Sequence, residues 1–328
     1  ALSAFQRERP QEAKRIVDAA NSSATWYEHF AEKLDRPTHD FAFDYLTRSR
    51  RMDMDRLRQE APGFMARYDG LKAESPDALK DPVAKKVPGA LEVDFDKTQH
   101  VNCSAMLWQN LERNPEKTAV TGPMGSLTYR ELIAQAAKWG NAFQRAGLGK
   151  TERIAFFLDD TPIFPAAFYG AVRAGLVPVL LNIQTKPEVL NYFLKDSGAR
   201  FALVDAGLAE IFDDKTQDST NLETLVIANG SSDAPNAVSA SEFLAGAAET
   251  LRVVDTGPDD MAFWMYSSGT TGRPKGIVHL HHDMAYIQQS FGAHVLKLRE
   301  SDVCYSVPKA YFAYGFGNSI VFPIACGA

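Results

Sequence analysis

The chain has 328 residues, 45% of them hydrophobic, and its 35 basic and 41 acidic residues give a net charge of -6. This length is sufficient for two domains with cores of their own. The negative charge, without any long basic run, argues against a general nucleic-acid-binding protein. The most apolar stretch, residues 163–183, is interrupted by Arg173, Gly175 and Pro178, which argues against a membrane span.

Three cysteines, Cys103, Cys304 and Cys326, are odd in number and widely spaced, which is typical of a reducing compartment. No signal peptide is recognisable at the N-terminus, so we expect a cytoplasmic protein. The chain begins without methionine and ends at Ala328, just after a segment, residues 319–324, that we predict to be a strand. We therefore expect a fragment of a longer protein, of unknown oligomeric state.

From residue 128 onward the apolar pattern alternates between helical and strand periods. Thr128 and Glu131 form a capping box that begins a helix ending near Gly147. Such alternation predicts an α/β fold with mostly parallel sheets and flanking helices. Residues 230–260 are weakly patterned and predict a surface connection with one short helix at 242–251. The predicted strands are 154–158, 177–181, 201–204, 225–228 and 261–265, and the predicted helices between them are 164–173 and 187–195.

The run YSSGTTGRPKG, residues 266–276, follows the apolar strand 261–265. Its glycines allow the backbone amides to approach an anion, its hydroxyls can donate hydrogen bonds, and Lys275 adds a mobile positive charge. In parallel sheets, ligands bind beyond the carboxyl ends of the strands, where this run lies. It is not a Walker P-loop, because Pro274 precedes the lysine and Gly276 follows it. The run predicts a cradle for a nucleotide phosphate.

The same run resembles the signature of the adenylate-forming superfamily, which includes acyl-CoA ligases, and matches it at every position. LTYREL at 127–132 and FYGAVRAGLVPVLLN at 168–182 occur in the order found in these ligases. The resemblance implies that residues 97–328 are the incomplete N-terminal domain of a ligase that uses ATP, Mg²⁺ and CoA. The phosphate-binding residues that it implies are Ser267, Ser268, Gly269, Thr270, Thr271, Gly272 and Lys275.

The segment PKAYFAYGFGNS, residues 308–319, is similar to KLFFAYGLGN of benzoate-CoA ligases, with Ala310, Tyr311 and Phe316 as replacements. The resemblance implies a small aromatic carboxylic acid as substrate and a role in the degradation of aromatic compounds. It places Ala313, Tyr314 and Gly315 in the pocket for the ring. A small residue beside a planar ring leaves a slot, and a phenol can donate a hydrogen bond. The alternative is that these aromatic residues only form a core.

Three histidines, His279, His281 and His282, follow the loop closely. They lack the spacing and the further ligands of a zinc site, so we assign no metal-binding residue. We expect His279 to be structural or to lie behind the site. His281 and His282 are predicted to form a solvated helix start.

The reaction implied by the resemblance has two steps, formation of an acyl-adenylate with release of pyrophosphate and transfer of the acyl group to CoA. The family's acidic Mg²⁺ ligand, ribose-binding aspartate and catalytic lysine would all follow Ala328. No catalytic residue is therefore assigned within the chain. We expect this chain alone to have no measurable ligase turnover.

Residues 1–28 and 41–68 resemble the C-terminal tail of flavin-dependent hydroxylases that act on salicylyl-CoA or 2-aminobenzoyl-CoA. We divide the chain into this helical segment at 1–70, a linker at 71–96 rich in proline and charge, and the ligase part at 97–328. FAD would bind only to a part upstream of this chain, because its glycine-rich fingerprint is not found here. A docking extension of the ligase itself is the alternative for the N-terminal segment.

Two other functions remain open from the sequence. One is an adenylating enzyme for a different acid or for the thiol of a carrier protein. The other is a folding or docking module without catalytic activity.

Overall fold

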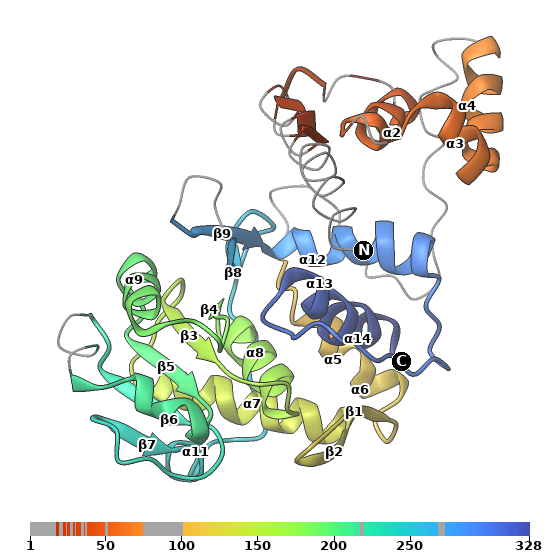
Figure 1. Ribbon diagram of the computed structural model, residues 1–328. Coiled ribbons are helices and arrows are strands. Elements are labelled where there is room, and N and C mark those ends of the chain that lie inside the picture. Colours follow the sequence, from red (N-terminus) through yellow and green to blue (C-terminus); the bar gives the residue numbers. More distant parts are fainter. Residues whose placement is uncertain are drawn as a thin grey trace, which may run out of the picture. The chain divides into compact units, whose positions relative to one another are not determined.

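The computed structural model divides into two compact units, Ala1–Lys86 and Val87–Ala328 (Figure 1). The residues that it describes are 18–19, 22–23, 25–26, 29, 31–33, 36, 38–49, 52–74, 101–214, 216, 220–267 and 273–328. In this part of the chain, no helix combines the length and the apolar character needed to cross a bilayer.

The described part of the N-terminal unit is helical, as predicted from the sequence. A small core forms where Leu57, Met65 and Tyr68 are buried, and the ring of Phe43 stacks on that of Tyr68 with centroids 4.8 Å apart. Trp26 donates a hydrogen bond from its indole to Asp44, at 2.8 Å. The elements are η1 (Ala31–Lys33), α2 (Thr38–Thr47), α3 (Met54–Glu60) and α4 (Pro62–Glu74).

The second unit is built on a seven-stranded sheet in the order β7-β6-β5-β3-β4-β8-β9. All neighbouring strands are parallel except β8 and β9, which form an antiparallel edge pair. The predicted α/β fold is confirmed, and five predicted strands occur within two residues of their expected bounds. The strands are β3 (Arg153–Phe157), β4 (Val177–Leu180), β5 (Phe201–Val204), β6 (Thr224–Ile227), β7 (Ala237–Ser239), β8 (Met261–Ser267) and β9 (Lys275–Leu280).

Two short strand features were not predicted from the sequence. β7 has only three residues, all half-buried, and such a short edge strand carries no clear alternation. A separate antiparallel pair, β1 (Thr118–Gly122) and β2 (Gly125–Thr128), precedes the sheet. These two strands are also short, and their burial does not alternate regularly.

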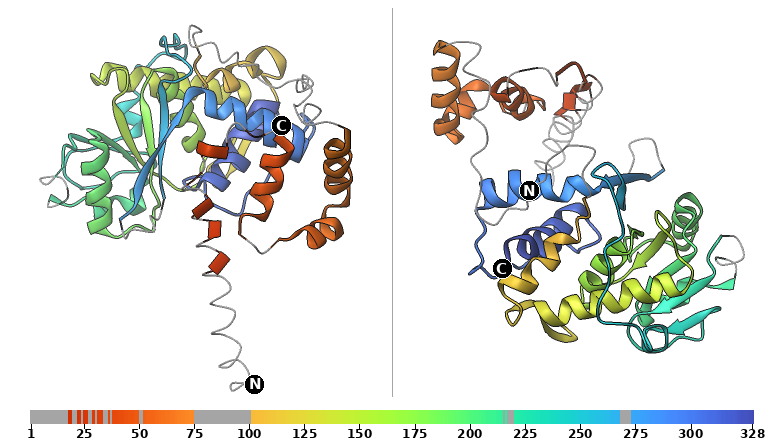
Figure 2. Two further views of the ribbon diagram at one scale, coloured as in Figure 1. Left: turned by 90° about the horizontal axis from the view of Figure 1, so that it is seen from above. Right: turned by 180° about the vertical axis from the view of Figure 1, so that it is seen from behind.

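Helices cover both faces of the sheet (Figure 2). One face packs against α7 (Tyr129–Arg145) and α8 (Ile163–Arg173), and the other against α9 (Pro187–Ser197) and η3 (Ala206–Ile211). The capping box of α7 is confirmed, since Thr128 N–H donates to Glu131 at 2.8 Å and Glu131 N–H donates to the Thr128 hydroxyl at 3.2 Å. Short helices α5 (Ala105–Trp108), α6 (Asn110–Arg113) and α11 (Ala240–Phe243) complete this part.

The C-terminal region is helical, and the strand predicted at residues 319–324 is wrong. Ile320, Val321 and Ile324 are all buried there, and a short continuous apolar run cannot distinguish a buried strand from a buried helix. The short helix predicted near 242–251 is present but lies earlier, because α11 ends at Phe243 and Gly246 has a positive φ of 71°. The elements are α12 (His281–Ile287), π-helical η4 (Gln288–Leu296), α13 (Ala313–Phe316), π-helical η5 (Gly317–Val321) and α14 (Phe322–Cys326).

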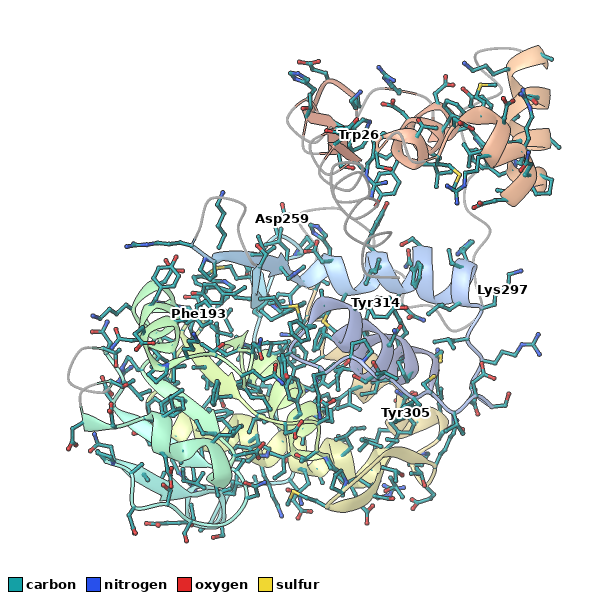
Figure 3. The ribbon with its side chains drawn as sticks, in the orientation of Figure 1. Trp26, Phe193, Asp259, Lys297, Tyr305 and Tyr314 are labelled. Carbon is teal, nitrogen blue, oxygen red and sulfur yellow. The ribbon has the colours of Figure 1, made fainter. Side chains whose placement is uncertain are left out.

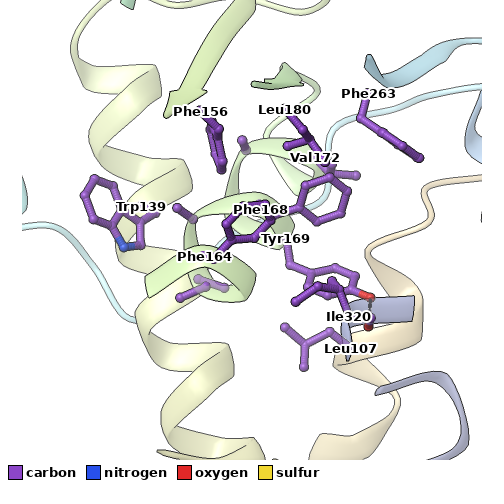
Figure 4. Packing of buried hydrophobic residues seen from close by; sticks show 14 of the residues in the cluster. Leu107, Trp139, Phe156, Phe164, Phe168, Tyr169, Val172, Leu180, Phe263 and Ile320 are labelled. Atoms are coloured by element: carbon purple, nitrogen blue, oxygen red, sulfur yellow. Dashed lines mark hydrogen bonds between the residues drawn. The ribbon is translucent and has the colours of Figure 1, made fainter. Parts of the chain in front are cut away.

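The main core joins the sheet to these C-terminal helices (Figure 4). The ring of Phe168 on α8 meets those of Phe263 and Phe316 edge-on, with centroids 5.6 and 4.9 Å apart. The Tyr169 hydroxyl donates a hydrogen bond to the carbonyl of Ile320 at 3.2 Å. The position of the C-terminal helices therefore depends on α8.

Helices α7 and α8 cross at a contact that only glycine permits. A Cβ built on Gly170 would lie 2.2 Å from the carbonyl oxygen of Ala136, and one on Gly140 would lie 2.6 Å from the carbonyl oxygen of Gly170. Both contacts are with backbone atoms, which cannot rotate away. Any side chain at either position would force the two helices apart.

We expect Gly170→Ala to lower the free energy of unfolding of this unit by about 1–3 kcal/mol or more, the usual cost of overpacking a core. Gly207→Ala is the matched control, because a Cβ there meets no atom within 4 Å. Urea unfolding followed by tryptophan fluorescence measures both. Equal midpoints for the two variants would contradict the tight crossing.

Candidate functional site

The phosphate-like run lies in the connection between β8 and β9. Ser267 and Lys275 are paired directly across the two strands, where the connection begins and ends. Both side chains are exposed. Ser268, Gly269, Thr270, Thr271 and Gly272 lie outside the described residues. Of the seven predicted phosphate-binding residues, the structure thus places two, and they are neighbours.

Helix α9 holds both strands of this hairpin near the loop. Tyr192 donates a hydrogen bond to the carbonyl of Pro274 at 3.0 Å, and Tyr266 donates to Asp196 at 2.8 Å. The ring centroids of Phe193 and Tyr266 lie 4.0 Å apart. Burial, together with the neighbouring carboxylate of Asp196, raises the pKa of Tyr266, so its hydroxyl remains a donor. Both described ends of the loop are therefore hydrogen-bonded to helix α9.

An apolar pocket of about 330 Å³ lies beside the hairpin. For comparison, a cavity of about 150 Å³ in a protein interior accommodates benzene. The walls come from β8, β9, α12, α13, η5 and α14. The lining residues are Phe263, Met265, His279, Asp283, Met284, Tyr286, Ile287, Ala313, Phe316, Gly317, Val321 and Phe322.

The predicted ring-binding residues are distributed differently around this pocket. Ala313 lines it, at a side accessible to solvent. Tyr314 is 68% exposed and is not among the lining residues (Figure 3). Gly315 is buried, and a Cβ there would lie 2.1 Å from the carbonyl oxygen of Lys309, so the glycine permits a tight turn. Phe316, noted in the sequence only as a replacement, forms part of the wall.

Sequence reasoning missed most of the lining residues. A weak signal existed, because Phe263 and Met265 are two residues apart on one face of β8. Asp283, Met284 and Ile287 likewise recur at helical spacing on α12. Nothing local to these residues shows that the two faces meet, since the contact depends on tertiary packing.

The prediction that His281 is solvated is wrong. Its side chain is 1% exposed, and its Nδ1 accepts a hydrogen bond from the Cys103 backbone N–H at 3.2 Å. His281 lies three and four residues before Met284 and Ala285, both buried, and therefore shares the inward face of α12. Burial lowers the pKa of His281 to about 4, so the ring is neutral at pH 7.

His282 is half-buried between two carboxylates, with Nδ1 3.3 Å from Asp259 and Nε2 3.1 Å from Asp283. In the described part of the chain, no group of three or more histidine, cysteine, aspartate and glutamate side chains is arranged to hold a metal ion. At the start of α12, His281 thus contacts a backbone amide and His282 two carboxylates.

The segment that carries Ala313 is tethered to the carboxyl end of β3. Lys309 Nζ lies 2.6 Å from Asp159 Oδ1, and Asp160 accepts a hydrogen bond from Ala310 N–H at 3.0 Å. The hydrogen bond from Lys309 lowers the pKa of Asp159, whereas burial raises that of Asp160. These contacts fix the approach of the segment to the pocket.

The run predicted to bind phosphate is thus tied to α9 at its described ends, and an apolar pocket lies beside it on a mostly parallel sheet. The family model described as "AMP-binding enzyme" matches residues 107–328. The chain belongs to this family of AMP-binding enzymes.

Among curated proteins, the chain is 38% identical to a benzoate–CoA ligase of Thauera aromatica over 213 residues, which cover 65% of this chain and 40% of the relative. It is also 38% identical to a 4-hydroxybenzoate–CoA/benzoate–CoA ligase of Rhodopseudomonas palustris, covering 65% of this chain and 39% of that protein. The chain therefore spans less than half the length of these relatives.

Two solved structures are similar over the same region. An anthranilate CoA ligase in complex with anthranoyl-AMP matches with a TM-score of 0.67 and 30% identity, over 70% of this chain and 44% of that one. A benzoate CoA ligase from Burkholderia xenovorans matches with a TM-score of 0.63 and 34% identity, over 69% and 44% of the two chains. The predicted resemblance to aromatic-acid CoA ligases is confirmed.

The buried His281 predicts a pH dependence of stability. Because its pKa falls from 6.5 to about 4 on folding, the unfolded chain binds the proton first. The free energy of unfolding is therefore unaffected by His281 above pH 6.5. As the pH falls from 6.5 to 4, protonation of the unfolded chain lowers this free energy by about 3 kcal/mol in all.

We expect His281→Asn to remove this part of the pH dependence between pH 6.5 and 4, because asparagine can accept the Cys103 N–H without titrating. The exposed His294 supplies the control variant His294→Asn, which should retain it. Urea unfolding across this pH range measures both. Parallel curves for the wild type and His281→Asn would contradict the assignment.

Proposed function

We propose that this chain forms the ATP-phosphate loop and the ring pocket of an AMP-forming CoA ligase for an aromatic acid. The observation that carries the proposal is the order of the paired residues on the β8–β9 hairpin. Phe263 is paired with His279, and Ser267 with Lys275, so the two end residues of the loop lie on the face of the hairpin that lines the pocket.

The spacing along β8 supports the coupling of the two parts. Met265 lines the pocket, and Ser267 is two residues further on the same face, about 7 Å away along the strand. An aromatic ring in the pocket can therefore hold its carboxylate near a nucleotide phosphate at the loop. Separate sites on opposite faces would not permit a reaction between the two.

In the proposed reaction, a carboxylate oxygen attacks the α-phosphorus of ATP and pyrophosphate leaves. The sulfur of CoA then attacks the acyl carbonyl carbon and AMP leaves. Lys275 and the hydroxyls of the loop stabilise the negative charge of the transferred phosphates, while the pocket orients the ring and excludes water from it. Mg²⁺ would enter with ATP and neutralise phosphate charge.

The other site assignments made from the sequence remain part of the proposal. Ser268, Gly269, Thr270, Thr271 and Gly272 would donate to the phosphates. Tyr314 would contribute to the ring site together with Ala313 and Gly315. The similarity to aromatic-acid ligases supports these assignments.

For the N-terminal unit we retain the proposal of a flavin hydroxylase tail joined by a linker to the ligase part. Its support is the resemblance of residues 1–28 and 41–68 and the helical structure of the described residues. A cytoplasmic location is likewise proposed, from the cysteine pattern. Sequence upstream of Ala1 that contains a flavin fingerprint would support the fusion, and its absence from the complete gene would contradict it.

We expect this chain to bind ATP with Mg²⁺ and Lys275→Ala to weaken that binding by about tenfold or more, because a charge-assisted contact with a phosphate is lost. Arg113→Ala, which removes an exposed positive charge at the end of α6, should leave the affinity unchanged. Isothermal titration calorimetry measures both. An unchanged dissociation constant for Lys275→Ala would contradict the role of the loop.

We also expect benzoate to bind to the pocket and Ala313→Leu to weaken that binding at least about tenfold, since a larger side chain fills the space required by the ring. ATP binding should persist, which shows that the variant is folded. Ala248→Leu, at an exposed position, is the control. Benzoate affinity that is equal in both variants would exclude this pocket as the ring site.

A further inference from the structure

The wall of the pocket carries an imidazole and a carboxylate, from His279 and Asp283, among mainly apolar and aromatic side chains. A benzene ring needs neither group. Polar groups in a largely apolar pocket usually fix the orientation and the identity of a ligand. The contacts of His279 and Asp283 show which of the two groups is available to bind a ligand.

The His279 ring is held in one plane. It stacks on Phe263 with centroids 4.5 Å apart and an angle of 11° between the planes. Its Nδ1 lies 3.4 Å from Asp283 Oδ2. The stacking and the carboxylate together determine which edge of the imidazole faces Asp283.

Asp283 also contacts two other groups of the protein. Oδ2 accepts the N–H of Leu280 at 3.0 Å, which caps α12, and Oδ1 lies 3.1 Å from Nε2 of His282. Burial raises the pKa of Asp283, but the hydrogen bonds from His279 and Leu280 outweigh it and lower the pKa overall. The carboxylate is therefore charged and can orient His279.

In the tautomer whose Nδ1 carries the proton towards Asp283, 3.4 Å away, the acceptor lone pair of the His279 ring is on Nε2. Within the described ranges, the polar and ring contacts of the His279 side chain are those with Asp283 and Phe263. Nε2 thus remains available as a hydrogen-bond acceptor at the pocket.

We infer that His279, positioned by Asp283, determines substrate specificity by accepting a hydrogen bond at Nε2 from a hydroxyl or amino group on the aromatic ring. The pocket would then prefer a hydroxy- or amino-substituted aromatic acid to benzoate. This inference rests on the proposed function, because it takes the pocket as the ring site. The competing explanation is that His279 only covers Phe263 as part of the hairpin.

The test compares the affinities of this chain for benzoate and for the three hydroxybenzoate and three aminobenzoate isomers by calorimetry. We expect at least one isomer to bind roughly 3- to 10-fold more tightly than benzoate, the usual effect of one hydrogen bond. His279→Phe should bring the affinity ratio of that isomer to benzoate close to one, because phenylalanine can still stack on Phe263 but offers no acceptor. His294→Phe, on the exposed side of η4, should retain the preference.

A second measurement does not depend on the variant being folded. In wild-type protein with ¹⁵N-labelled histidine, the preferred isomer should move the Nε2 resonance of His279 upfield, and benzoate should not. Asp283→Asn should reduce the preference, since the ring is no longer oriented by a charge.

The possible outcomes distinguish a failure of the proposed function from a failure of the role of His279. Failure of every aromatic acid to bind would overturn the proposed function and this inference with it. Benzoate binding without preference for any isomer, or a preference that persists in His279→Phe with no Nε2 shift in the wild type, would overturn only the role of His279.

Discussion

The antiparallel pairing of β8 with β9 is the constraint on which the site depends. Its register places Ser267 beside Lys275 at the loop, and Phe263 beside His279 at the pocket, on one face of the hairpin. A slip of one residue would turn one strand's side chains to the opposite face. The loop would then keep its composition but lose the neighbouring pocket. Two hydrogen bonds to α9 oppose such a slip. Tyr192 on α9 donates to the carbonyl of Pro274, next to β9, and Tyr266 on β8 donates to Asp196 on α9.

The pocket is completed by segments distant in sequence, which the core brings to the hairpin. Phe168 on α8 contacts both Phe263 on β8 and Phe316 on α13. Helix α8 therefore holds this strand and this C-terminal helix next to each other. Lys309 adds a polar tether to the carboxyl end of β3. The tight crossing of α7 and α8 at Gly170 sets the position of Phe168 and therefore contributes to the shape of a pocket that it does not line.

Local signals predicted most of the sheet. The capping box at Thr128 and the continuous apolar strands are determined by neighbouring residues, and these elements were placed correctly. Predictions failed where burial depends on distant partners. The apolar run at 319–324 forms helix because the core surrounds it, and His281 is buried because Cys103, almost 180 residues away, lies against it. A polar residue at a helix start is solvated only if its face of the helix is exposed.

By itself, the sequence determined the chemistry of the site: hydroxyls, glycines and a lysine after a strand, and an aromatic segment similar to that of benzoate ligases. These features are local, since they require only residue types at close spacing. The tertiary structure alone decided which side chains form the pocket, because Phe263, His279, Asp283 and Phe316 meet only through strand register and helix packing. It also decided that His279 lies in the wall of the pocket, with Nδ1 3.4 Å from Asp283, because the pairing of β9 with β8 brings it beside Phe263.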